Sequence, residues 1–145
     1  MTSTATSLWR FSKTINDCLD RILQPIIRRY GLTVTQAQLL CSVQKSGSST
    51  VGAIAKTLGL ACTNTSAMCK KLSQMGFLHR KRRENDKRIV SIMLTDEGQD
   101  AAREIEVYMD RIYASQKKNP NLKELENLMD SLVAFSNACQ KELKE

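Results

Sequence analysis

The sequence predicts a mainly α-helical fold with one small β-hairpin. Apolar residues recur at three- and four-residue steps along most of the chain, which indicates helices with one buried face. A two-residue alternation occurs only near residues 77–94. The composition is that of a globular protein, with 41% hydrophobic and 26% charged residues and only two prolines. A length of 145 residues fits a single domain spanning residues 1–145.

The first predicted helix covers residues 7–30. Pro25 is expected to bend or locally break it, because proline removes a helical hydrogen bond. Gly31 then caps the helix, and Thr33 with Gln36 three residues later forms a capping-box pattern that starts the second helix. That helix ends at the turn-rich segment 46–49. The apolar positions of the two helices are Leu8, Phe11, Ile15, Leu19, Ile22, Ile26, Ala37, Leu39, Leu40 and Val43.

Two short helices follow, joined by a turn at Gly59. The first is capped by Thr50 and is expected to point Ala53, Ile54 and Leu58 inward, while the small Ala55 lets another helix approach closely. The second covers about residues 63–75 and ends at Gly76. Its apolar side consists of Met68, Cys69, Leu72 and Met75. This arrangement indicates a helix-turn-helix.

A hairpin is predicted next, with strands in residues 77–81 and 88–94. One face of the second strand carries Ile89, Ser91 and Met93, and the other carries Val90, Ile92 and Leu94. Residues 82–88 form the tip. Six of the nine residues from 80 to 88 are basic and two are acidic, so this stretch supplies +4 of the formal net charge of +7.

The last two predicted helices cover residues 95–118 and 121 to the C-terminal region. Thr95 caps the first and Asn121 the second, with "NPN" at 119–121 as the break. The apolar stripes consist of Ala102, Ile105, Met109, Ile112, Leu122, Leu125, Leu128, Leu132, Phe135 and Cys139. The central part of the chain offers too little surface to cover the apolar stripes of residues 7–30 and 99–145. We therefore expect these residues to form a dimer interface.

A helix-turn-helix followed by a basic hairpin is a winged helix. A helix fits the DNA major groove, and a hairpin beside it reaches phosphates or a narrow minor groove. An isoelectric point near 9.3 favours a nucleic-acid partner over an anionic membrane surface. We expect Asp86 to pair with the Arg88 side chain and hold it extended toward the minor groove. Phosphate affinity would come from Arg80, Lys81, Arg82, Arg83 and Lys87, whereas the sequence assigns Glu84 no role.

Four motifs in order resemble the MarR family of bacterial regulators: "LT-x-x-Q", "AIAKTLGL", "KKLSQMGFLHRK" and "DKRIVSIMLTDEG" at residues 86–98. The last is similar to the family's wing signature D-x-R-x-x-x-V-x-L-T-x-x-G, with Ile92 at the valine position. The resemblance spans residues 31–98 and implies a homodimeric winged-helix DNA-binding protein. It also implies a DNA affinity that changes with a small ligand or with thiol oxidation.

The resemblance assigns the recognition helix to the region of residues 62–71. The family often has arginines at the positions of Cys62 and Ala67, and neither is basic here. The polar candidates for base contacts are therefore Thr63, Asn64, Ser66 and Lys70. The usual Asp-Pro of the wing is replaced by Arg83-Glu84, which makes the loop more basic and less stiff.

The cysteines indicate a reducing cytoplasm, since no secretory signal is evident. Four of them are expected to be small core residues: Cys18, Cys41, Cys69 and Cys139. Cys62, at the start of the recognition helix, is the candidate redox thiol, although a small residue at a tight turn is the plainer interpretation. A single histidine, His79, and the absence of CxxC pairs give no support for a metal site, a cofactor or an enzyme.

The sequence therefore favours a cytoplasmic, dimeric DNA-binding transcription regulator, a repressor released from a pseudo-palindromic operator by a small effector. The alternatives are a thiol-oxidation-responsive regulator on the same fold, or a winged helix that binds nucleic acid nonspecifically or binds another protein. No apolar run reaches the ~20 residues of a membrane span, so no membrane partner is expected.

Overall fold

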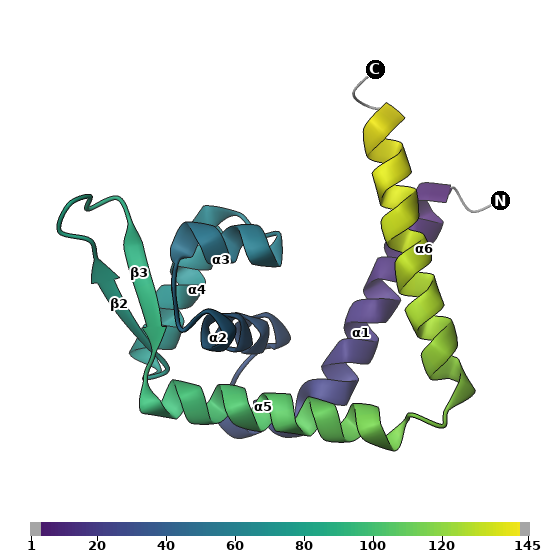
Figure 1. The fold of residues 1–145 in the computed structure, drawn as a ribbon, viewed down its shortest axis with the longest axis horizontal. Coiled ribbons are helices and arrows are strands. Elements are labelled where there is room, and N and C mark those ends of the chain that lie inside the picture. The colour runs from purple at the N-terminus through teal and green to yellow at the C-terminus, as the bar shows by residue number, and fades with distance from the viewer. Residues whose placement is uncertain (1–3, 143–145) are drawn as a thin grey trace. The chain divides into compact units, whose positions relative to one another are not determined.

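The computed structural model describes residues 4–142, which form six helices and a three-stranded sheet (Figure 1). The predicted fold class, mainly helical with a small β-wing, is confirmed. The chain divides into two compact units, residues 1–109 and 110–145, with the boundary inside the fifth helix. Each unit is described by itself.

Helix α1 (Thr4–Tyr30) runs through Pro25 without interruption, so the predicted local break is wrong. Pro25 is exposed, and its lost hydrogen bond lies on the solvent side of the helix. Only the C-terminal third of α1 enters the core, through Leu23, Ile26 and Ile27. The apolar positions nearer the N-terminus, among them Leu8, Trp9 and Ile15, remain exposed.

Helix α2 (Val34–Ser46) begins at the predicted capping box. Thr33 Oγ1 accepts a hydrogen bond from the Gln36 amide at 3.2 Å, and the Gln36 side chain accepts one from the Thr33 amide at 2.9 Å. Two of the free amides at the helix start are satisfied in this way. Its apolar side, with Leu39, Leu40 and Val43, has no solvent exposure and lies at the centre of the core.

Helices α3 (Val51–Leu58) and α4 (Cys62–Gln74) form the predicted helix-turn-helix. Thr50 caps α3, and Gly59 takes the left-handed conformation, φ +65°, that the turn requires. Ile54 and Ala55 are buried, whereas Ala53 is exposed, so the inward orientation predicted for Ala53 is wrong.

The sheet is antiparallel with the order β1–β3–β2: β1 is Ser48–Thr50, β2 is Leu78–Arg82 and β3 is Val90–Leu94. The hairpin is confirmed, and the structure shows that the face with Ile92 and Leu94 is the buried one. The strand β1 was not predicted. It lies in a serine-rich segment that the sequence suggested was only a turn, and it pairs Ser49 with Ile92.

Helix α5 (Asp96–Ser115) begins where predicted, with Thr95 Oγ1 accepting from the Gly98 amide at 3.0 Å. It ends three residues before the expected Lys118. Its first half buries Ala101, Ala102 and Ile105 in the core of the first unit, which includes residues of α1, α2, α3, α4 and the sheet.

Helix α6 (Pro120–Glu142) is capped by Asn119 rather than by the predicted Asn121. Asn119 Oδ1 accepts from the Asn121 amide at 3.0 Å, and Pro120 occupies the first helical position, where its missing N–H costs nothing. Within its described residues α6 buries no side chain. No helix between residues 4 and 142 is both long and apolar enough to cross a bilayer.

Candidate nucleic-acid interface

Helix α4 presents a polar face to solvent because its opposite face is anchored in the core. Thr65, Cys69 and Leu72 repeat at four- and three-residue steps and are fully buried. The Thr65 hydroxyl donates to the Ala61 carbonyl at 3.0 Å, so it is not available to a ligand.

The sequence candidates on α4 lie on the outward side. Thr63, Asn64 and Lys70 are exposed, and Ser66 is half-buried. Two further exposed polar residues, Lys71 and Gln74, share this face and were missed by the sequence analysis. Their seven-residue spacing from Asn64 and Ala67 is the signal that identifies them.

The basic residues of the hairpin are divided between its two faces. Arg80 pairs with Ile92 across the strands and therefore shares the inward face, which packs against α4. It is half-buried, and its Nε has no hydrogen-bond partner within the described residues. Lys81 pairs with Ser91 on the opposite face and is exposed. The exposed basic residues of the hairpin are Lys81, Arg82, Arg83, Lys87 and Arg88.

Asp86 stabilises the loop through hydrogen bonds to the backbone, and not through the expected ion pair with the Arg88 side chain. Its Oδ1 accepts from the backbone amide of Arg88 at 3.0 Å, and its carbonyl accepts from the Ile89 amide at 3.0 Å. The ion pairs found among the described residues do not include Asp86 with Arg88, so the predicted side-chain pair is wrong. A short aspartate side chain bonds readily to the backbone two residues later, and this turn outcompetes the exposed ion pair.

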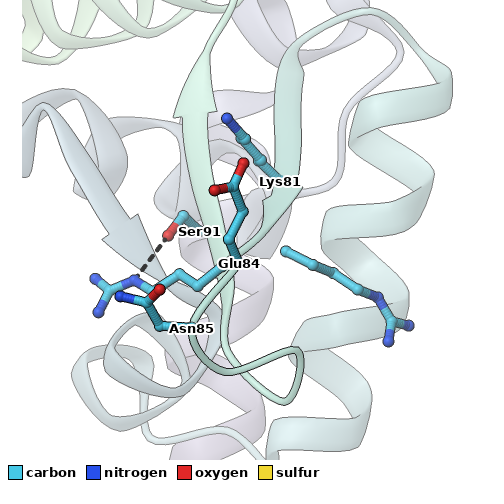
Figure 2. A pocket seen from close by; sticks show the side chains of 6 residues that line it. Lys81, Glu84, Asn85 and Ser91 are labelled. Atoms are coloured by element: carbon cyan, nitrogen blue, oxygen red, sulfur yellow. Dashed lines mark hydrogen bonds between the residues drawn. The ribbon is translucent and has the colours of Figure 1, made fainter.

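Arg83 is the basic residue that the loop holds most firmly. Its amide donates to the Ile89 carbonyl at 3.0 Å, and its Nε donates to Ser91 Oγ at 3.3 Å. Figure 2 shows this second bond at the edge of a shallow pocket of about 370 Å³, whose other labelled side chains are Lys81, Glu84 and Asn85. The Glu84 and Lys81 side chains extend to the same side of the hairpin in this view, although they form no ion pair.

A second hollow, of about 470 Å³, joins the wing to the start of α4. Arg83 and Arg88 contribute from the wing, and Cys62, Thr63 and Ser66 contribute from α4. The start of α3 and residues 89 and 90 complete its walls. The structure thus brings five predicted site residues to one place: Cys62, Thr63, Ser66, Arg83 and Arg88. The other predicted site residues do not line this hollow: Asn64, Lys70, Arg80, Lys81, Arg82, Asp86 and Lys87. Asp86 acts indirectly, because it shapes the loop that carries Arg88.

The thiols fall into two groups. Cys62 is the first residue of α4 and is exposed, and Cys18 is exposed on α1. Cys69 is fully buried, and burial raises its pKa, with the Arg80 charge acting in the opposite direction. Burial, with a smaller effect of the Glu106 charge, raises the pKa of Cys41 to about 11. Cys139 is half-buried, and all five cysteines are unpaired.

Comparison with known proteins identifies the family. Residues 21–105, more than half of the chain, match the family described as transcriptional regulator SarA/Rot. The chain belongs to the SarA/Rot family of transcriptional regulators. The predicted resemblance to the MarR family is confirmed, because MarR proteins are among the relatives of this chain. The relatives are transcriptional regulators.

Among the relatives of this SarA/Rot chain is the HTH-type transcriptional regulator YhbI of Bacillus subtilis, 27% identical over 91% of this chain and 88% of that protein. The multiple antibiotic resistance protein MarR of Salmonella typhimurium is 31% identical over 63% of each chain. A mutant MarR from E. coli complexed with operator DNA has the same fold, with a TM-score of 0.72 at 24% identity over 87% of this chain and 93% of that one.

Two other structures share the fold. NadR in complex with 4-hydroxyphenylacetate has a TM-score of 0.70 at 20% identity, and covers 93% of this chain and 96% of its own. Reduced AbfR bound to DNA has a TM-score of 0.67 at 23% identity, with 89% and 95% covered. Together with the MarR structure, they show that the chain has the winged-helix fold of MarR-type proteins.

Proposed function

We propose that the protein is a homodimeric DNA-binding repressor, released from a pseudo-palindromic operator by a small ligand. The observation that carries the proposal is the hollow in which Arg83 and Arg88 of the wing meet the start of α4. A polar helix face beside a strongly basic hairpin suits a major groove and its flanking phosphates. The MarR structure with operator DNA supports this use of the fold.

In this proposal residues 31–98 form the DNA-binding lobe, and residues 7–30 and 99–145 form the dimerisation helices. Two copies of α4 would enter successive major grooves, about one helical turn or ~10 bp apart. Thr63, Asn64, Ser66 and Lys70 face the bases, and Arg88 enters the adjacent minor groove. The remaining exposed cations of the wing contact phosphates. Arg80, being half-buried, contributes mainly to the packing of the hairpin on α4.

The apolar surface of the terminal helices supports a homodimer. Leu128, Met129, Val133 and Phe135 on α6 are each at least 41% exposed, and so are Leu8 and Trp9 on α1. Exposed apolar side chains at this density mark an interface. A second copy of the chain would bring the same exposed apolar faces. It would also supply the second α4 helix that a symmetric DNA site requires.

The ligand is a small effector that binds between the dimerisation helices and the DNA-binding lobe. It would change the distance between the two copies of α4 and so lower the DNA affinity. The NadR structure with 4-hydroxyphenylacetate supports a ligand on this fold. The chain carries out no catalysis in this proposal, and it acts in the cytoplasm, as its five unpaired cysteines suggest.

A gel shift tests the DNA-binding function. The probe is the DNA upstream of the protein's own gene, with random duplex as competitor and a series of salt concentrations. Retention of the probe against excess competitor is expected for a regulator. If the shifted complex disappears steeply with added salt, and random competitor removes it as well as the specific duplex does, the protein is a nonspecific nucleic-acid binder. Absence of any shift would favour a protein-interaction module.

A thiol-responsive regulator is the second candidate, and the position of Cys62 favours it. This exposed thiol lies on the wall of the hollow that also contains Arg83 and Arg88. Oxidation there would place a bulkier, charged group where DNA is expected to pass. Peroxide should then abolish the gel shift of the wild type and spare Cys62→Ser. An unchanged shift, or an equal response of Cys62→Ser, would exclude this candidate.

A further inference from the structure

Arg83 differs from the other exposed cations of the wing in how it is held. Its backbone is fixed by Ile89 and its Nε by Ser91 Oγ, which leaves the two terminal nitrogens of the guanidinium free. An arginine fixed through Nε keeps the fork that binds two oxygens of one phosphate group. The structure gives the Arg88 side chain no such bond; only its backbone amide is held, by Asp86.

The place where Arg83 is fixed also matters. It lies on the wall of the hollow at the start of α4, together with Arg88 and with the Thr63 and Ser66 hydroxyl groups. The small side chains of Cys62 and Ser66 leave this hollow open, at about 470 Å³. Two arginines and two hydroxyl-bearing residues line this space, and guanidinium and hydroxyl groups can both donate hydrogen bonds to a phosphate oxygen.

We propose that Arg83, positioned by Ser91, holds one phosphodiester group of the DNA backbone beside this hollow, next to the minor groove that Arg88 enters. The inference deepens the proposed function, on which it rests. Arg83 is the binding residue and Ser91 the positioning residue. Binding one backbone phosphate at the junction of α4 and the wing fixes the register of both elements on the duplex.

Phosphate ethylation interference tests the proposal on the full-length protein and the upstream duplex. The wild type should be sensitive to ethylation at one phosphate in each half-site that no longer matters to Arg83→Ala. The same variant should bind the duplex about tenfold more weakly. In a plot of the logarithm of DNA affinity against the logarithm of salt concentration, its slope should become shallower by about one for each wing. Arg103→Ala, which removes the same group from the exposed side of α5, serves as the charge control and should retain the wild-type interference pattern.

Ser91 is tested by rescue. Ser91→Ala should lose part of the affinity that Arg83→Ala loses, and Ser91→Thr, which keeps a hydroxyl in a strand position, should restore it. In the Arg83→Ala background, Ser91→Ala should have no further effect, because the side chain that it positions is gone. An additive loss in the double variant would show that Ser91 acts only on the folding of the strand, and would overturn its assigned role.

The outcomes separate the two proposals. If the wild type binds its upstream DNA and Arg83→Ala has the same salt slope and interference pattern, the phosphate site is wrong while the regulator stands. If the wild type binds no duplex, both are wrong. Inorganic pyrophosphate provides the last arm: if it displaces DNA from the wild type at micromolar concentration but not from Arg83→Ala, the hollow binds a free phosphate compound, which overturns the backbone assignment.

Discussion

Asp86 acts on the wing through the Arg88 backbone amide, and this distinction can be measured. Asp86→Asn removes the charge but keeps the Oδ1 acceptor, whereas Asp86→Ala removes both. We expect Asp86→Asn to bind the upstream DNA at least as tightly as the wild type, because one negative charge near the phosphates is lost. Asp86→Ala should bind about fivefold more weakly than Asp86→Asn, the equivalent of one hydrogen bond of ~1 kcal/mol. Equal weakening in both variants, measured by fluorescence anisotropy, would show that the charge is what matters.

The thiols allow a second residue-scale prediction. With a pKa of about 11, Cys41 carries thiolate at roughly a thousandth of its population at pH 8, and it is also half-buried. Iodoacetamide should therefore modify exposed Cys62 and Cys18 well before Cys41 or buried Cys69, as followed by mass spectrometry of the intact chain and its peptides. Chemical denaturation should remove the difference. Similar rates in the folded protein would contradict the burial of Cys41.

The raised pKa of Cys41 also has a consequence for stability, with a definite sign. The folded state holds the thiol proton up to about pH 11, and the unfolded state releases it near the ordinary value of 9. The folded state therefore binds more protons between these values, and stability falls as the pH rises through that window. Burial raises the pKa of Cys69 in the same direction. The urea concentration at the midpoint of unfolding should not change below pH 9 because of these thiols. Above pH 9 it should decrease as the pH rises.

At the scale of elements, the start of α5 is fixed by a close approach of two backbones. A Cβ added at Gly98 would lie 2.1 Å from the Phe77 carbonyl oxygen, which belongs to the backbone and has little room to move. We expect Gly98→Ala to lower the free energy of unfolding by at least the ~1–3 kcal/mol typical of overpacking. Gly52→Ala is the matched control, since it lies inside α3 with nothing within 4 Å of the added atom. It should stabilise by about 0.5–1 kcal/mol. Urea denaturation distinguishes the two, and equal effects would contradict the contact.

The elements also show which features the sequence could predict. The capping box at Thr33 and the hairpin were predicted because each has a local signature that needs no distant partner. The strand β1 could not be, since three residues of Ser and Thr become a strand only by pairing with β3. The same limit applied to the wing: the loop composition predicted a basic tip, but only the fold shows that Arg80 turns inward and that Arg83 is bonded to Ser91.

At the scale of the whole molecule, the terminal helices α1 and α6 differ from the rest of the chain, because many of their apolar side chains are exposed. The first unit has a complete core, built from the C-terminal part of α1 through the first half of α5. Helix α6, in contrast, buries no described side chain, yet it carries leucines at the spacing of a packed face. A helix of this kind is stabilised mainly by packing, so we expect α6 to be covered by another surface, which the proposed homodimer would provide.

Leu128→Glu tests whether that partner is a second copy of the chain. Light scattering of the wild type at micromolar concentration should give twice the 16.3 kDa of one chain. A carboxylate buried in an apolar seam without a counter-charge is strongly unfavourable, so Leu128→Glu should shift the mass toward one chain. The adjacent Asn127→Glu adds the same charge about 100° around the helix, away from the leucine stripe, and should stay dimeric. Loss of the dimer should also remove specific DNA retention, because a single α4 reads only half of a symmetric site. A wild type that scatters as one chain, or a Leu128→Glu variant that remains a dimer, would show that α6 serves another purpose.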